Sequence, residues 1–79
     1  MKCRIKTFGV ARDILGSKEL IFEIRGNKVI DLRNELLKKY PSLESLNSLL
    51  IAVNQSYSED DAELTETDEI ALIPPVSGG

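Results

Sequence analysis

The chain has 79 residues, 42% of them hydrophobic and 29% charged, which is typical of one small globular domain. It contains no histidine and one cysteine, Cys3, which excludes an internal disulfide, a zinc site and a serine–histidine catalytic arrangement. It has no glycine-rich phosphate-binding loop and no run of roughly 20 apolar residues. We therefore expect a protein that binds no metal or other cofactor, enters no membrane and is not an enzyme on its own. The single thiol and a start unlike a signal peptide, "MKCRIKTFGV", favour a cytoplasmic location.

Charge divides the chain into two unlike parts. Residues 1–40 hold all ten Lys and Arg and five acids, a net charge of +5, whereas residues 41–79 hold eight acids and no base, a net charge of −8. An acidic half disfavours nucleic acid and anionic membranes as partners. Two interpretations stay open for it: a solvated face, or a surface that attracts a basic partner protein.

Two stretches near the start alternate between apolar and polar residues, which is the period of a half-buried strand. They are residues 2–8, where Phe8 falls on the outward face, and residues 19–25. The inward-facing positions are Cys3, Ile5, Thr7, Leu20, Phe22 and Ile24. Between the strands, residues 10–16 predict one helical turn that Gly16 closes in a left-handed conformation. We expect the two strands to form a hairpin across this long connection.

Residues 28–40 change to helical spacing. Asn27 is the expected N-cap, and Pro41 prevents the helix from continuing. The apolar stripe of this helix consists of Val29, Leu32, Leu36, Leu37 and Tyr40. The sequence thus predicts one amphipathic helix with a single buried face.

The second half predicts two further strands, residues 49–55 and residues 68–73, joined by turns with at most one short strand. This order of elements is that of an α+β, β-grasp (ubiquitin-like) fold, in which a mixed sheet wraps around one main helix. In that fold the first and last strands lie side by side and parallel. We therefore expect a domain over residues 1–73, with Phe8 and Ile73 close together on its outward face, beside an extended tail over residues 74–79.

The tail, "PPVSGG", has features that suit chemistry at its end. Pro74 and Pro75 favour an extended backbone, and six residues after Ile73 reach roughly 20 Å. Gly78 and Gly79 lack side chains, so the terminal carboxylate can enter a narrow channel. A carboxylate becomes an acyl donor only after activation, for example by ATP, and nothing in this chain suggests an ATP site. The alternatives are a carrier activated by a partner or an inert, disordered tail.

The stretches "AVNQ", "DEIA" and "PPVSGG", together with "FGVARDILG" near the start, resemble the MoaD family of molybdopterin synthase small subunits. The resemblance implies that Gly79 is the reactive residue, adenylated at its carboxylate and converted to a thiocarboxylate. It implies that residues 74–78 (Pro74, Pro75, Val76, Ser77 and Gly78) thread into the partner. It also implies partner contacts at Phe8, Arg12 and Ile73.

The same resemblance implies a set of partners. A MoeB-like enzyme would use ATP and magnesium to adenylate the tail, and a persulfide donor would supply sulfur. A MoaE-like large subunit would then receive the tail, in a heterotetramer with two copies of each subunit. The sulfur would pass to cyclic pyranopterin monophosphate, so that the small subunit is a sulfur donor and not a catalyst.

Other functions remain open for the same fold and terminus. They are a ubiquitin-like protein modifier, a dual-role modifier and sulfur carrier, a thiamine-pathway sulfur carrier, and an interaction module with an inert tail. Two smaller predictions concern side chains that invite a functional interpretation. Cys3 is expected in the core, where a thiol is unreactive. Asp60, Asp61 and Glu63 lack the spacing of a calcium loop and are expected to be solvated turn residues.

Overall fold

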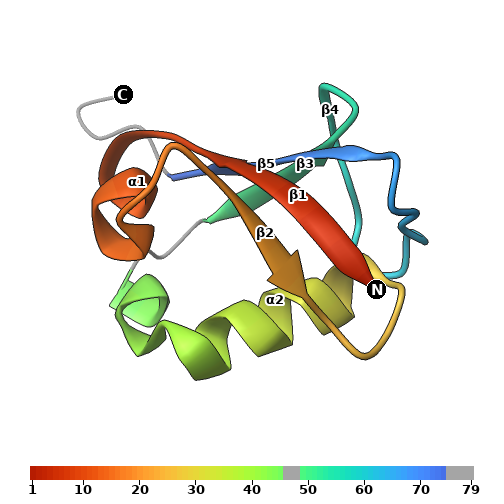
Figure 1. Cartoon of the computed structure of the whole chain (residues 1–79), viewed down its shortest axis with the longest axis horizontal. Coiled ribbons are helices and arrows are strands. Elements are labelled where there is room, and N and C mark those ends of the chain that lie inside the picture. The colour runs from red at the N-terminus through yellow and green to blue at the C-terminus, as the bar shows by residue number, and fades with distance from the viewer. Residues whose placement is uncertain (46–48, 75–79) are drawn as a thin grey trace.

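The computed structural model describes residues 1–45 and 49–74, and within them one sheet curves over one long helix (Figure 1). The sheet has the order β2-β1-β5-β3-β4, so β2 and β4 form its edges. Its strands are β1 (Lys2–Thr7), β2 (Glu19–Glu23), β3 (Leu50–Val53), β4 (Ser56–Tyr57) and β5 (Glu69–Ile73). The helices are α1 (Gly9–Leu15), α2 (Val29–Lys39) and the 3₁₀ helix η1 (Pro41–Ser45). This is the predicted β-grasp fold.

The strand pairing confirms the predictions for the first and last strands. β1 pairs antiparallel with β2, as the expected hairpin, and parallel with β5. The parallel register places Thr7 opposite Leu72. The next residues along, Phe8 and Ile73, therefore lie at the same end of the sheet, where the tail begins.

The core lies between the inner face of the sheet and α2. The inward positions predicted in the first two strands are buried, except Leu20, which packs partly buried against the core. On β5, Ile70 and Leu72 are buried as well. From α2 the buried side chains are Val29, Leu32 and Leu36, with Leu37 and Tyr40 packed partly buried beside them. Burial of each large aliphatic side chain contributes roughly 1.5–3 kcal/mol, which is what holds the helix against the sheet.

The predicted boundaries differ from the observed ones by up to two residues, and two of these differences have a clear structural cause. The N-cap of α2 is Lys28, not Asn27, because the carboxylate of Asp31 accepts the backbone N–H groups of both residues, at 3.1 and 3.2 Å. The third strand ends at Val53 and not at residue 55. Asn54 and Gln55 both have positive φ, 53° and 70°, and form a two-residue turn into β4.

Within residues 1–45 and 49–74, no helix is long and apolar enough to cross a membrane. The same residues hold no cluster of three or more acidic, cysteine or histidine side chains suited to a metal ion.

Candidate functional site

The tail leaves the domain at a close contact between Pro74 and Gly9. Gly9, the first residue of α1, has φ +56°, a conformation that costs little only for glycine. A Cβ at this position would lie 3.2 Å from Cγ of Pro74. A residue without a side chain at position 9 therefore lets the first proline of the tail pack against the start of α1.

Beside this exit the outward face of the sheet is hollowed. One row of paired residues crosses four strands there, and two of them, Ala71 and Ala52, are small and form the floor. Phe8, which is 51% exposed, and Tyr57, which is 69% exposed, stand at either side. The hollow holds about 430 Å³ and is lined by Lys6, Phe8, Ala52, Gln55, Tyr57, Glu69, Ala71 and Ile73. We call these eight residues the tail-root hollow.

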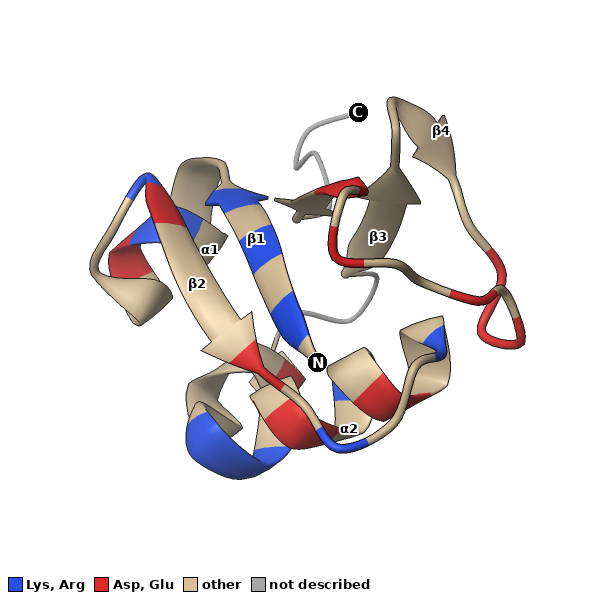
Figure 2. Cartoon of the chain, turned by 45° about the vertical axis from the view of Figure 1, so that its right-hand side comes forward, with Lys and Arg blue, Asp and Glu red and all other residues tan. Residues whose placement is uncertain are grey.

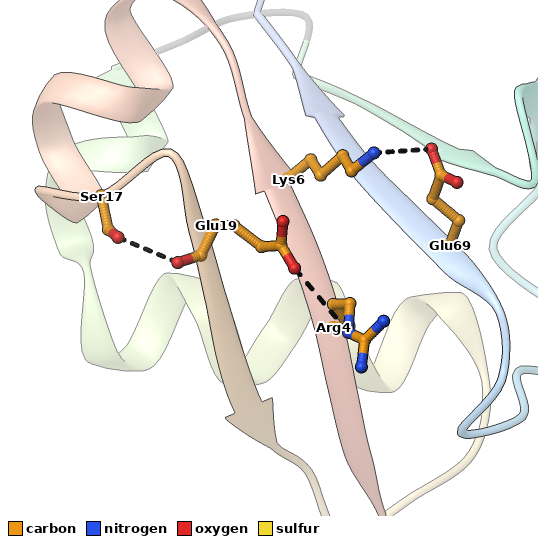
Figure 3. A network of polar contacts seen from close by, with 5 residues as sticks. All are labelled: Arg4, Lys6, Ser17, Glu19 and Glu69. Atoms are coloured by element: carbon orange, nitrogen blue, oxygen red, sulfur yellow. Dashed lines mark hydrogen bonds and ion pairs between the residues drawn. The ribbon is translucent and has the colours of Figure 1, made fainter.

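The rim of the tail-root hollow carries charge. Nζ of Lys6 lies 3.3 Å from Oε1 of Glu69 (Figure 3). Outside the hollow, Nε of Arg4 lies 3.7 Å from Oε1 of Glu19 (Figure 3). These side chains are exposed, so each pair adds at most about 1 kcal/mol to stability. An apolar floor with an exposed polar rim is the arrangement of a protein-docking surface.

A hydrogen-bonded clamp joins the stretches "AVNQ" and "DEIA" to each other. The backbone N–H of Glu69 donates to Oδ1 of Asn54 at 3.0 Å, and Nδ2 of Asn54 donates to Asp68 at 2.9 Å. Asp68 also accepts the backbone N–H of Thr65 at 2.8 Å. The backbone hydrogen bond from Thr65 and, after it, the bond from Asn54 lower the pKa of Asp68 below its ordinary value. The clamp fixes the β3–β4 turn against the start of β5 and so sets the position of Tyr57.

Arg12 lies apart from this site. It is exposed on α1 and lines a separate hollow of about 340 Å³ with Asp13, Gly16, Ser17 and Lys18. The structure therefore brings together Phe8 and Ile73, but not Arg12, in the tail-root hollow. A partner contact at Arg12 stays a prediction.

The reactive part of the predicted site lies outside the described residues. Pro75, Val76, Ser77, Gly78 and Gly79 belong to it, and their roles stay predictions. Of the tail, the structure describes only Pro74.

The remaining candidates are structural. Cys3 is 1% exposed, as predicted, and burial raises the pKa of its thiol, so it is protonated at neutral pH. Asp60, Asp61 and Glu63 are exposed, as predicted. Asp60 also pairs with Arg33, whose Nε lies 3.3 Å from its Oδ1, so it ties the acidic turn to α2.

Fold and site together define a small ubiquitin-like protein with a partly apolar hollow at the root of a tail that ends in Gly-Gly. A family model comparison matches residues 5–79 to the ThiS family. The molybdopterin synthase sulfur carrier subunit of Arabidopsis thaliana is 35% identical over 81 residues, covering 100% of this chain and 84% of that protein. That of Chlamydomonas reinhardtii is 34% identical over the whole of both chains. The chain belongs to the ThiS family, and its resemblance to the MoaD branch is confirmed.

Solved structures agree with this assignment. The putative molybdopterin converting factor subunit 1 of Pyrococcus furiosus has a TM-score of 0.83 at 29% identity, covering 96% of this chain and 99% of that one. Subunit 1 in a complex with subunit 2 of the Helicobacter pylori factor matches over the full length of both chains, with TM-score 0.69 and 29% identity. SAMP1 of Haloferax volcanii also matches over both full lengths, with TM-score 0.81 and 26% identity.

Proposed function

We propose that this chain is the sulfur-carrier subunit of a molybdopterin synthase. The observation that carries the proposal is the full-length similarity to proteins named as such carriers, combined with a terminus that ends in Gly-Gly. The tail-root hollow supports it, because it offers a partner an apolar surface beside the point where the tail leaves the sheet.

The chemistry takes place at the Gly79 carboxylate and is catalysed by partners. A MoeB-like enzyme, using ATP and magnesium, joins the carboxylate oxygen to AMP and releases pyrophosphate. A persulfide sulfur attacks the glycyl carbonyl, so a C–S bond forms and AMP leaves. A thiol then attacks the donor's own S–S bond, which releases the thiocarboxylate and leaves that thiol joined to the donor cysteine in a disulfide. The chain itself contributes a carboxylate on an unbranched, uncharged tail, which can be buried at low cost.

Sulfur delivery occurs in a large subunit. The tail enters a MoaE-like protein, and the thiocarboxylate passes its sulfur to cyclic pyranopterin monophosphate in the cytoplasm. Two deliveries complete one dithiolene, which fits a heterotetramer with two copies of each subunit. The apolar residues Phe8, Tyr57 and Ile73 hold the carrier against the large subunit while the tail is inserted.

Reconstitution tests this proposal. Thiocarboxylated chain, mixed with a MoaE-like large subunit and the pterin precursor, should yield molybdopterin and return the chain with an ordinary carboxylate. The unmodified chain is the control and should form the complex without product. Sulfur-loaded chain that binds the large subunit but gives no product would contradict the proposal.

A second candidate, protein modification, is favoured by one observation. The chain also matches the small archaeal modifier protein SAMP1 of Methanosarcina acetivorans, with TM-score 0.80 and 30% identity over 99% of this chain and 96% of that one. The same acyl adenylate can react with a lysine amine in place of a persulfide. Isopeptide-linked Gly-Gly remnants on lysines of cellular proteins would distinguish this role.

A further inference from the structure

The free edge of the sheet along β2 is a second surface with a distinct character. β2 is an edge strand of the sheet (Figure 2). It borders a groove of about 470 Å³. The groove is lined by Ile21, Phe22 and Glu23 from β2 and by Glu35, Lys38 and Lys39 from α2. None of these residues belongs to the tail-root hollow.

Backbone geometry shows which groups β2 presents at this edge. Met1 and Ile24 exchange two backbone hydrogen bonds of 2.8 Å, and the register continues with Cys3 opposite Phe22. In an antiparallel pair, such bonded positions alternate with positions whose N–H and C=O point away from the neighbouring strand. Ile21 and Glu23 are at these alternate positions, so their backbone groups face the open edge.

At the Glu19 end of the β2 edge, a backbone hydrogen-bond acceptor is already in use. Oγ of Ser17 donates to the carbonyl oxygen of Glu19 at 2.9 Å (Figure 3). The residues left to accept a new strand are therefore Ile21 and Glu23, each with one donor and one acceptor. Ile21 also exposes 66% of its surface on the outward face.

The charged side chains of β2 indicate which kind of strand can pair with its open edge. A two-fold pairing of two β2 strands centred on Ile21 would place Glu19 of each copy opposite Glu23 of the other, which is unfavourable. Lys or Arg at those positions of an incoming strand would lie beside Glu19 and Glu23 on the outward face, whereas Lys38 and Lys39 line the groove from α2 on the other side. β1 already has this pattern on the other side of β2, where Lys6 and Lys2 stand opposite the two glutamates.

We propose that the β2 edge binds an extended, basic segment of another protein, which adds to the sheet as a sixth strand. The segment places an apolar residue opposite Ile21 and Lys or Arg two positions to either side. Its alternate side chains point toward α2 and lie over Phe22, whose ring is buried and has Nζ of Lys39 at 5.9 Å from its centre. The tail-root hollow stays free, so one partner can hold the carrier while another receives its tail.

Amide hydrogen exchange on the full chain tests the proposal with a defined probe. The probe is the capped peptide acetyl-SKVIVKS-amide, and its control has glutamate in place of both lysines. At saturating probe, exchange at the amides of Ile21 and Glu23 should slow by at least about tenfold, because new strand bonds protect them. Exchange at Leu20 and Phe22, which already bond to β1, should not change. The acidic peptide should bind about tenfold more weakly.

Two variants identify the contact. Ile21→Pro removes the outward N–H without removing a bond to β1 and should weaken probe binding about tenfold. Glu23→Lys should instead reverse the preference between the two peptides. Leu50→Ala, at an exposed apolar residue of β3, is the matched control and should bind the probe normally.

Three outcomes would overturn the proposal. They are unchanged exchange at Ile21 and Glu23 with the probe at saturation, equal affinity for both peptides, and protection without peptide that grows with protein concentration. The last would identify a second copy of the chain as the occupant.

Discussion

Replacing Phe8 with alanine tests whether the tail-root hollow is the surface that the large subunit contacts. Phe8 is 51% exposed, so about 100 Å² of the roughly 150–250 Å² that a phenylalanine can bury remains to be covered by a partner. At about 25 cal/mol per Å², that area corresponds to about 2.5 kcal/mol, or about 70-fold in Kd. Alanine keeps part of the contact, so we expect the affinity for the large subunit to fall about 20- to 70-fold.

Isothermal titration calorimetry of the chain against the large subunit measures this loss. Ile21→Ala is the matched control, since Ile21 is also exposed and apolar but lies at the β2 edge. Both variants should unfold within about 1 kcal/mol of the wild type, because neither side chain is part of the core. An unchanged affinity for Phe8→Ala, or an equal loss for Ile21→Ala, would refute the assignment of the surface.

The remaining predictions concern the tail exit, the clamp and the core thiol. Gly9→Ala should lower the free energy of unfolding in urea more than Gly16→Ala does. Both glycines have positive φ, which costs alanine about 1 kcal/mol, but only a Cβ at position 9 meets Pro74. Equal losses of stability would contradict the packing of Pro74 against Gly9. The pKa of Asp68 is lowered from 3.8 in the folded state. The contribution of its carboxylate to folding stability is therefore present above that value and is lost as the pH falls through the lowered pKa. Asp68→Asn should lower the free energy of unfolding by about 0.5–1 kcal/mol at pH 7 and make it less dependent on pH in acid. The same dependence on pH in acid as the wild type would argue against the clamp. Cys3 should react with a thiol reagent only at the rate of unfolding, and rapid labelling of the native protein would show that it is not buried.

The fold could be predicted from the sequence because the apolar residues of its first two strands and of its main helix recur at the spacing expected for each element. Alternation in residues 2–8 and 19–25 sets which side chains enter the core, and a one-residue shift would expose all of them. The helix boundary was less predictable. Asp31 caps the backbone of two residues at once, so the identity of Asn27 as a good N-cap residue did not decide where α2 begins.

The candidate site was predicted only in part. Phe8 and Ile73 followed from the parallel pairing of the first and last strands, but Tyr57 did not. It lies in a two-residue strand within an acidic, turn-rich segment, and its position depends on the Asn54 turn. Gly9 was missed as well, although a glycine directly after a strand was a usable signal. The depth of the hollow comes from the two alanines, and that they stand opposite each other follows only from the strand register.

The most direct test of the account is the intact mass of the chain after incubation with its activating enzyme, ATP, magnesium and a persulfide donor. The expected result is the mass gain of one oxygen replaced by sulfur, confined to the C-terminal peptide and absent from a chain extended by one alanine after Gly79. An unchanged mass with an activating enzyme that loads another carrier in the same assay would contradict it. So would sulfur loading of the extended chain, since the reactive group would then not be the Gly79 carboxylate.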